Sequence, residues 1–350
     1  MKSNFRFCIG LLTAMIALGS LPYVLQGDYF FFAAFSVLQF VVMATAWNIL
    51  GGNTGYVNFG AAAFFAIGAY STVAAFKLFK ASILVCIIFG TANAALIGLA
   101  MGYLTLRLKG VFFSIATLAL SVVLMTIVLN TDFLGGARGV YVIVDRTPLF
   151  GLPRYIHLLY WIMLLISGFA IIVARTIQHS GMGQGLSAIR DDEGAAECLG
   201  VPTLKLKLIA TTISGGLMGL AGTVFPFLIT YIDPTSTFNL SISVNSIAMP
   251  LIGGMSTWMG PVIGALLLGS IQQIATVTIS SAGNLLIVGF LLVYLSFSRP
   301  MASWVGLTSG AREGSGDVRA LIGGVLPDKA FRGIYCTRQC EPVDSPWREG

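Results

Sequence analysis

The charged residues of this chain are so widely spaced that they leave neutral segments long enough to cross a membrane. Only 10% of the 350 residues are charged, whereas a soluble domain carries about 25%, and the mean hydropathy is +0.88. This composition excludes an ordinary cytosolic enzyme. Roughly 20 apolar residues span the hydrocarbon core as a helix, so each neutral segment predicts at least one span. The segments are 7–27, 29–76, 81–106, 110–131, 155–174, 208–232 and 234–298.

The lengths of these segments add up to nine or ten spans, and we predict a bundle of about 8–10 transmembrane helices. Five of them are long enough for one span each, 29–76 for two, and 234–298 for two or three. Strict alternation of apolar and polar residues does not occur in them, so helices are expected and not a barrel. We therefore predict an all-α fold, a polytopic integral membrane helical bundle, over residues 1–307.

The distribution of charge predicts which loops face the cytoplasm. The net charge of +6 lies wholly within 1–307, because the tail 308–350 carries six residues of each sign. With ten spans and a cytoplasmic N-terminus, nine Lys and Arg residues fall in inside loops and five in outside loops, in agreement with the positive-inside rule. The basic charge is therefore topological and does not indicate nucleic-acid binding. The tail has no apolar segment of span length and is predicted to be a soluble, disordered extension.

The N-terminus and the cysteines bear on processing and on metal binding. Residues 1–20 fit a cleavable signal peptide, but the apolar stretch continues past Pro22 to Leu25, which favours a first transmembrane span. The five cysteines have no metal-ligand spacing, so we predict free thiols and no metal site.

Glycine and polar residues interrupt two of the long segments, at 48–58 and at 250–261. Broken helices at membrane depth often form transport sites, whereas the alternative is that both are loops at the membrane surface, and for 51–58 the two interpretations are equally good. Elsewhere, Gly98 with Gly102 and Gly215 with Gly219 have the small-xxx-small spacing of closely packed helices. The segment 131–154 holds several Gly and Pro residues and is predicted to be an irregular external loop.

The longest polar interruption in the membrane body, 175–207, contains a predicted amphipathic helix. Its apolar residues fall near one face, and Gly200 with Pro202 ends it. Such a face predicts a docked partner, because an exposed helix has little other reason to keep it. The alternative is a helix lying on lipid headgroups, which the four acidic residues disfavour. The apolar residues are Leu186, Ile189, Ala196 and Leu199.

Five motifs occur along the chain in an order typical of one transporter family. The loop motif runs from Ile189-Arg-Asp-Asp-Glu193 through Ala195-Ala196 to Leu199-Gly200-Val201. The other four are Trp47–Leu50 with Gly55–Tyr70, Leu106–Gly110 with Thr117–Ala119, Gly253–Ala265, and Arg299–Pro300. Over nearly the whole membrane body, the chain resembles the LivM-type permease subunits of branched-chain amino acid ABC transporters.

This resemblance implies a role for the loop. Residues 186–199 would form the coupling helix that sits in a groove of an ATPase subunit, and rigid-body movement of the ATPase would reach the spans through it. The implied contact residues are Leu186, Ile189, Arg190, Asp191, Asp192, Glu193, Ala196, Glu197, Leu199 and Gly200.

The resemblance also implies a cellular setting. The chain would be a multi-pass protein of the bacterial inner membrane, working with two ABC ATPase subunits, a second homologous permease and an extracytoplasmic substrate-binding protein. ATP would bind only to the partner subunits, so this chain would need no cofactor and have no catalytic residue. Leucine, isoleucine or valine would cross as a zwitterion along polar, uncharged side chains, although ordinary interhelical hydrogen bonds explain the same residues. Candidates for that path are Asn48, Asn53, Tyr56, Asn58, Ser114, Thr117 and Asn245.

The chain departs from the family pattern at two positions. Position 61 is Ala where many relatives carry His. Gly194 stands where the general loop motif begins, and glycine there costs the helix roughly 1 kcal/mol against Ala.

The sequence also bears on other functions. No lysine follows a glycine, so the chain has no phosphate-binding loop and is not itself the ATPase. Urea or short amides remain alternative substrates. An ATP-independent channel or carrier is disfavoured by the scarcity of ionisable residues in the spans, and a purely structural subunit is the last alternative.

Overall fold

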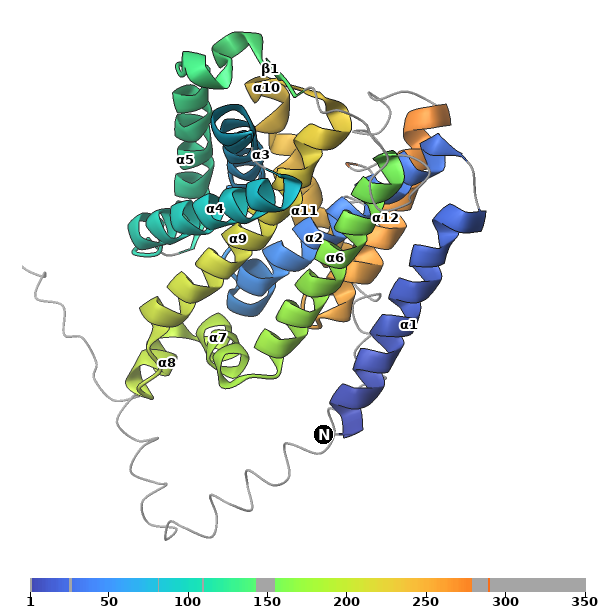
Figure 1. The fold of residues 1–350 in the computed structure, drawn as a ribbon. Coiled ribbons are helices and arrows are strands. Elements are labelled where there is room, and N and C mark those ends of the chain that lie inside the picture. The colour runs from blue at the N-terminus through green and yellow to red at the C-terminus, as the bar shows by residue number, and fades with distance from the viewer. Residues whose placement is uncertain are drawn as a thin grey trace, which may run out of the picture. The chain divides into compact units, whose positions relative to one another are not determined.

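The computed structural model describes residues 2–24, 27–80, 82–108, 110–142, 155–278 and residue 289 (Figure 1). The chain divides into two units, Met1–Ser298 and Arg299–Gly350, and the second unit lies outside the described residues together with the predicted tail. The α-helices of the described part are α1 Lys2–Val24, α2 Asp28–Thr54, α3 Ala61–Phe79, α4 Ile83–Thr105, α5 Val111–Leu129, α6 Tyr155–Gln178, α7 Gly181–Asp191, α8 Glu193–Cys198, α9 Thr203–Ile229, α10 Pro234–Thr237, α11 Leu240–Gly253 and α12 Met259–Thr278.

Seven of these helices are long and apolar enough to cross a membrane, namely α2, α3, α4, α5, α6, α9 and α12. Every neutral segment of the sequence contains at least one helix, and 29–76 holds two, as its length predicts. The prediction of an all-α, multi-pass bundle is therefore confirmed. The remainder of 234–298 after Thr278 lies, except for Gly289, outside the described residues, as does 143–154 of the predicted external loop.

The order of the helices places successive loops at alternate ends of the bundle. The α2–α3 and α4–α5 connections lie at the end that carries α7 and α8, and Ser114 Oγ of α5 donates to Val57 O across them at 2.8 Å. The opposite end carries two 3₁₀ turns, Asp132–Leu134 and Gly136–Arg138, and a short antiparallel pair (Figure 1). In that pair β1 (Val140–Tyr141) joins β2 (Tyr231–Ile232), with Val140 opposite Ile232.

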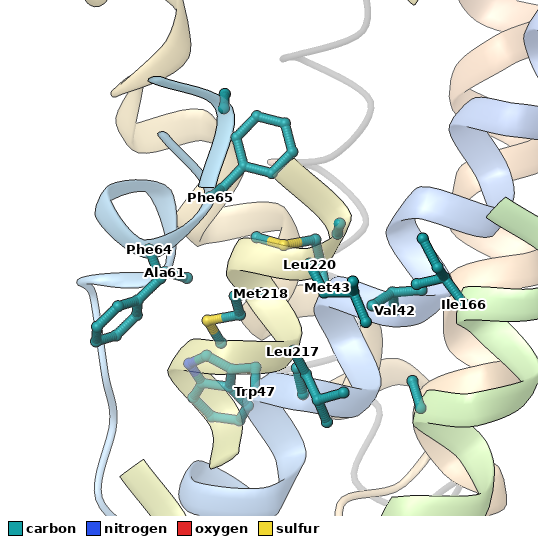
Figure 2. Close-up of a cluster of buried hydrophobic side chains, with 14 of the residues drawn as sticks. Val42, Met43, Trp47, Ala61, Phe64, Phe65, Ile166, Leu217, Met218 and Leu220 are labelled. Carbon is teal, nitrogen blue, oxygen red and sulfur yellow. The ribbon is translucent and has the colours of Figure 1, made fainter. Parts of the chain in front are cut away.

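The core lies where α2, α3, α6 and α9 meet, and Figure 2 shows its apolar side chains converging from these helices. Phe64, Phe65 and Met218 are completely buried. Trp47 is also buried, and its indole Nε1 donates to Asn58 O at 2.8 Å, which satisfies the one polar atom it brings into the core. The core is therefore tied directly to the connection between α2 and α3.

Glycines allow α9 to approach α3 and α4 closely. A Cβ on Gly68 of α3 would lie 2.7 Å from the carbonyl carbon of Gly219, and a Cβ on Gly215 would lie 3.3 Å from the Cα of Gly98 on α4. The first distance leaves no room for a side chain, and the second would require the neighbouring helix to shift by a few tenths of an ångström. The packing interpretation of the small-xxx-small pairs is thus confirmed.

Candidate functional site: the α7–α8 loop and the segment beneath it

The predicted coupling helix is two helices. Ser180 caps α7 by accepting from Gly183 N–H, and α7 ends at Asp191. Asp192 then has an extended backbone, and its Oδ1 accepts from Gly194 N–H at 2.8 Å and Ala195 N–H at 3.1 Å to start α8. The expectation of one continuous helix over 186–199 is wrong, because an aspartate is more stable as an N-cap than inside a helix. Gly194 therefore lies in a first turn and not in a helix interior.

The apolar face of this loop packs on the chain itself. Leu186, Ile189 and Ala196 are 0%, 3% and 2% exposed, and α7 contacts α2, α6 and α9. The prediction that these three residues form an open stripe for a partner is therefore wrong. Helices of 11 and 6 residues are too short to be stable alone, so their apolar side chains are used to anchor them. Only Leu199, at 83% exposed, remains open.

Most of the predicted polar residues are exposed, as Leu199 is. We call this set the exposed loop surface. It consists of Arg190, Asp191, Asp192, Glu197, Leu199 and Gly200. Two of its members also contact this chain: Arg190 donates through Nη1 to Gly52 O at 3.2 Å, and Glu197 accepts from Thr203 Oγ1 at 2.7 Å. The Arg190–Asp191 pair is exposed and 3.9 Å apart, so it adds little stability.

Glu193, by contrast, points into the chain. Its Oε1 lies 2.6 Å from Lys207 Nζ of α9, and its Oε2 accepts from the Tyr56 hydroxyl at 2.5 Å. The Lys207 side chain is 2% exposed and that of Glu193 15%. A buried ammonium requires a counter-ion, which is why this carboxylate turns inward. The expectation that Glu193 is an outward contact with the ATPase is corrected accordingly. We call Tyr56, Glu193 and Lys207 the clasp.

Tyr56 completes the clasp from the connection between α2 and α3. Lys207 Nζ lies 3.4 Å from its hydroxyl oxygen and 4.7 Å from the centre of its ring, and the Phe113 ring packs edge-on at 5.2 Å. Burial and then the hydrogen bond to Glu193 raise the pKa of Tyr56 well above its usual value. The hydroxyl therefore remains a proton donor to Glu193.

The connection that carries Tyr56, residues 55–60, is bonded to the helices around it. Phe59 N–H donates to Thr117 Oγ1 of α5 at 3.2 Å. Ser243 Oγ of α11 donates to Phe59 O at 2.8 Å and accepts from Ala62 N–H at 2.9 Å. Within the connection, Asn58 Oδ1 accepts from Gly60 N–H at 2.8 Å. Residues 55–60 are thus fixed to α2, α3, α5 and α11.

Four of the seven predicted path residues lie together, and the other three do not. Tyr56, Asn58, Ser114 and Thr117 gather at residues 55–60, where their polar atoms make the bonds just described. Asn53 donates to Ile49 O at 3.1 Å within α2.

Two further path residues lie apart from that group. Asn245 accepts from Gln272 of α12 at 3.1 Å. Asn48 is buried in α2, and its Oδ1 has no hydrogen-bond partner among the described residues.

Sequence reasoning missed two residues that organise this region, Lys207 and Ser243. Lys207 looks like an ordinary loop charge next to Lys205, and only its position in the second turn of α9 places it inside. Ser243 lies in an apolar stretch where serine has no distinctive pattern.

A cavity elsewhere in the described structure is apolar. An apolar cavity of about 520 Å³ lies between α1, α2, α6 and α12, and Ser167 supplies its one polar side chain among the described residues apart from the Trp258 indole. No cluster of three metal-ligating side chains occurs in the described ranges. Cys198 is an exposed thiol that forms no disulfide among the described residues.

Residues 29–296 match the protein-family model that is described as the permease component of a branched-chain amino acid transport system. The chain belongs to this permease family. It is 27% identical to the high-affinity branched-chain amino acid permease protein LivM of Escherichia coli (strain K12) over 286 residues, 75% of this chain and 66% of that protein. The permease thus spans slightly less than two thirds of that relative.

Two other relatives are named as an amino-acid permease and a sugar permease. The permease is 24% identical to the probable branched-chain amino acid permease protein LivH of Methanocaldococcus jannaschii, over 69% of this chain and 78% of that one. It is 26% identical to the L-arabinose permease protein AraH of Azospirillum brasilense, over 59% and 61%. No solved structure matches the chain. With seven apolar helices and this family, the permease is a multi-pass protein of the bacterial inner membrane.

Proposed function

We propose that this chain is the membrane-spanning subunit of an ATP-driven importer for branched-chain amino acids. The observation that carries the proposal is the α7–α8 loop, which is anchored to the bundle by its apolar face and exposes Leu199 and several charged residues at one end. Such an element suits a partner that pushes or pulls on the bundle from outside the membrane. The family match over residues 29–296 supports the same assignment.

The partners follow from the same proposal. An ATPase subunit docks on the exposed loop surface, and a second ATPase docks on a second, homologous permease. An extracytoplasmic binding protein delivers the substrate at the end that carries β1 and β2. ATP binds to the ATPases and no cofactor binds to this chain.

The substrate is the least constrained part of the proposal. Leucine, isoleucine and valine are favoured by the names of the LivM and LivH relatives, whereas the AraH relative carries the name of a sugar permease. Uptake of labelled leucine by cells that express the chain with its neighbouring transport genes tests this directly. Unlabelled leucine should block uptake, and urea, acetamide and L-arabinose should not. Uptake that continues after ATP depletion would refute the ATP-driven mechanism. Inhibition by arabinose or urea alone would keep the importer and assign it a different substrate.

The docking surface is tested by Leu199→Asp. The substitution places a charge on the exposed loop surface and leaves the buried face intact, so the chain should still insert. If Leu199 is a hot spot of the docked interface, recovery of the ATPase with the chain should fall at least about tenfold, because losing a hot-spot residue costs about 2 kcal/mol or more. Leu199→Met is the matched control and should retain the ATPase. Normal recovery with Leu199→Asp would place the ATPase elsewhere.

A further inference from the structure

The clasp connects three parts of the chain that are distant in sequence. Tyr56 lies between α2 and α3, Glu193 is the first residue of α8, and Lys207 lies in the second turn of α9. Both oxygens of the Glu193 carboxylate are engaged inside the chain, one with each partner. The first residue of α8 is therefore held between a transmembrane helix and the α2–α3 connection.

A gain in folding stability does not explain why the Glu193–Lys207 ion pair is buried. The desolvation of two charges offsets much of their attraction, and apolar residues of similar volume often serve as well or better. A buried ion pair that also accepts a tyrosine hydrogen bond does provide fixed geometry, here 2.6 Å to Lys207 Nζ and 2.5 Å to the Tyr56 hydroxyl. The clasp thus keeps α8 in one position relative to Tyr56.

Beyond Tyr56, residues 55–60 lead to the membrane helices. Val57 O accepts from Ser114 of α5, Asn58 O accepts from Trp47 of α2, and Phe59 O accepts from Ser243 of α11. A displacement of α8 that moves Tyr56 therefore reaches three helices through direct hydrogen bonds. Arg190, bonded to Gly52 O, is a second connection from the same loop to the end of α2.

We propose that the clasp carries movement of the α7–α8 loop into the transmembrane helices, with Glu193 acting as a positioning residue and not as a contact with the ATPase. The proposal depends on the proposed function, because a docked ATPase must supply the movement. It assigns different roles to two acidic residues of α8: Glu193 couples inside the chain, and Glu197 belongs to the docking surface.

The test is Glu193→Gln in the complete transporter reconstituted in vesicles. The ATPase should still be recovered with the variant and hydrolyse ATP, whereas leucine imported per ATP should fall roughly tenfold, inside the 5–150-fold range of typical coupling free energies. Glu197→Lys is the matched contrast, one turn further along α8. It should lower recovery of the ATPase and leave import per ATP unchanged in the complexes that form. Unchanged import per ATP in Glu193→Gln would overturn the proposal.

A double variant separates coupling from folding. Glu193→Leu with Lys207→Met removes both charges, so no unpaired charge stays buried and the chain should fold. If the clasp transmits movement, this variant remains uncoupled. Restoration of normal import per ATP would show that the pair is needed for packing alone, which would overturn the proposal.

Hydrogen exchange distinguishes failure of the clasp from failure of the proposed function. In the purified chain, Glu193→Gln should speed exchange of the amides in 55–60 about tenfold, because local opening becomes easier when a tertiary contact is lost. Unchanged exchange would overturn the clasp even where the wild type transports normally. Faster exchange in a complex whose wild type shows no ATP-driven uptake would refute the importer and keep the mechanical connection.

Discussion

Replacing Gly68 with alanine should weaken the contact between α3 and α9 more than any substitution of a loosely packed glycine. The added Cβ would overlap the carbonyl oxygen of Gly219, its nearest neighbour, and would lie 2.7 Å from that carbonyl carbon and 2.8 Å from the Gly219 Cα. Non-bonded carbon atoms normally approach to about 3.5–4.0 Å, so α3 and α9 must separate by about 1 Å. Each atom pair in contact between the two helices then loses a quarter to a half of its van der Waals attraction. Backbone must move here, because no flexible side chain occupies the space.

The expected loss of stability is about 2 kcal/mol. Overpacking costs roughly 1–3 kcal/mol, and the rigid neighbour puts Gly68 at the upper end, while alanine returns up to about 1 kcal/mol of helix propensity. Unfolding of the purified chain by sodium dodecyl sulfate in mixed micelles measures the change. Gly216→Ala is the matched control on α9, since its Cβ would lie 3.3 Å from the Ala95 methyl group, and it should change stability by less than about 1 kcal/mol. Equal effects of the two substitutions would refute the reasoning.

Three further predictions concern the α7–α8 loop and residues 55–60. Glu193→Gln should cost about 3 kcal/mol by leaving a buried ammonium unpaired, and Lys207→Met should cost less because Glu193 keeps some exposure and its bond to Tyr56; detergent unfolding that ranks them in reverse would contradict this. Gly194→Ala should stabilise the chain by up to about 1 kcal/mol, since the helix gains propensity and the new Cβ would lie 3.4 Å from its nearest neighbour. A lower unfolding midpoint would count against it. Ser243→Ala should cost about 1–3 kcal/mol by leaving two buried backbone groups unbonded, and unaltered amide exchange at Ala62 would argue otherwise.

The membrane bundle was predictable because its main determinant is local in sequence. A helix that crosses lipid must satisfy its own backbone hydrogen bonds, so the length of each neutral segment alone limits the number of spans. The pairs Gly98 with Gly102 and Gly215 with Gly219 likewise indicated close packing, because a missing side chain has the same consequence in any partner helix. They did not indicate that Gly68 of α3 would meet the same face of α9.

The candidate site was predictable only in outline. The segment 186–199 does form helices in the loop between α6 and α9, and the exposed positions of Arg190, Asp191 and Leu199 suit a docking role that stays a prediction. The period of 3.6 residues places Leu186, Ile189 and Ala196 on one face, but it does not say whether lipid, a partner or the chain itself covers that face. Asp192 interrupts the helix because its carboxylate caps α8, an effect that amphipathic periodicity does not reveal.

The sequence by itself determined that this chain lies in a membrane, where its long apolar segments fall and which loop is charged, since these follow from hydropathy along contiguous residues. Only the tertiary structure decided that Glu193 faces inward, because its partners lie 137 residues before it at Tyr56 and 14 residues after it at Lys207. A buried charge is stabilised by whichever opposite charge the fold brings within hydrogen-bonding distance. That distance arises from the packing of α8 and α9 against residues 55–60, which no local pattern encodes.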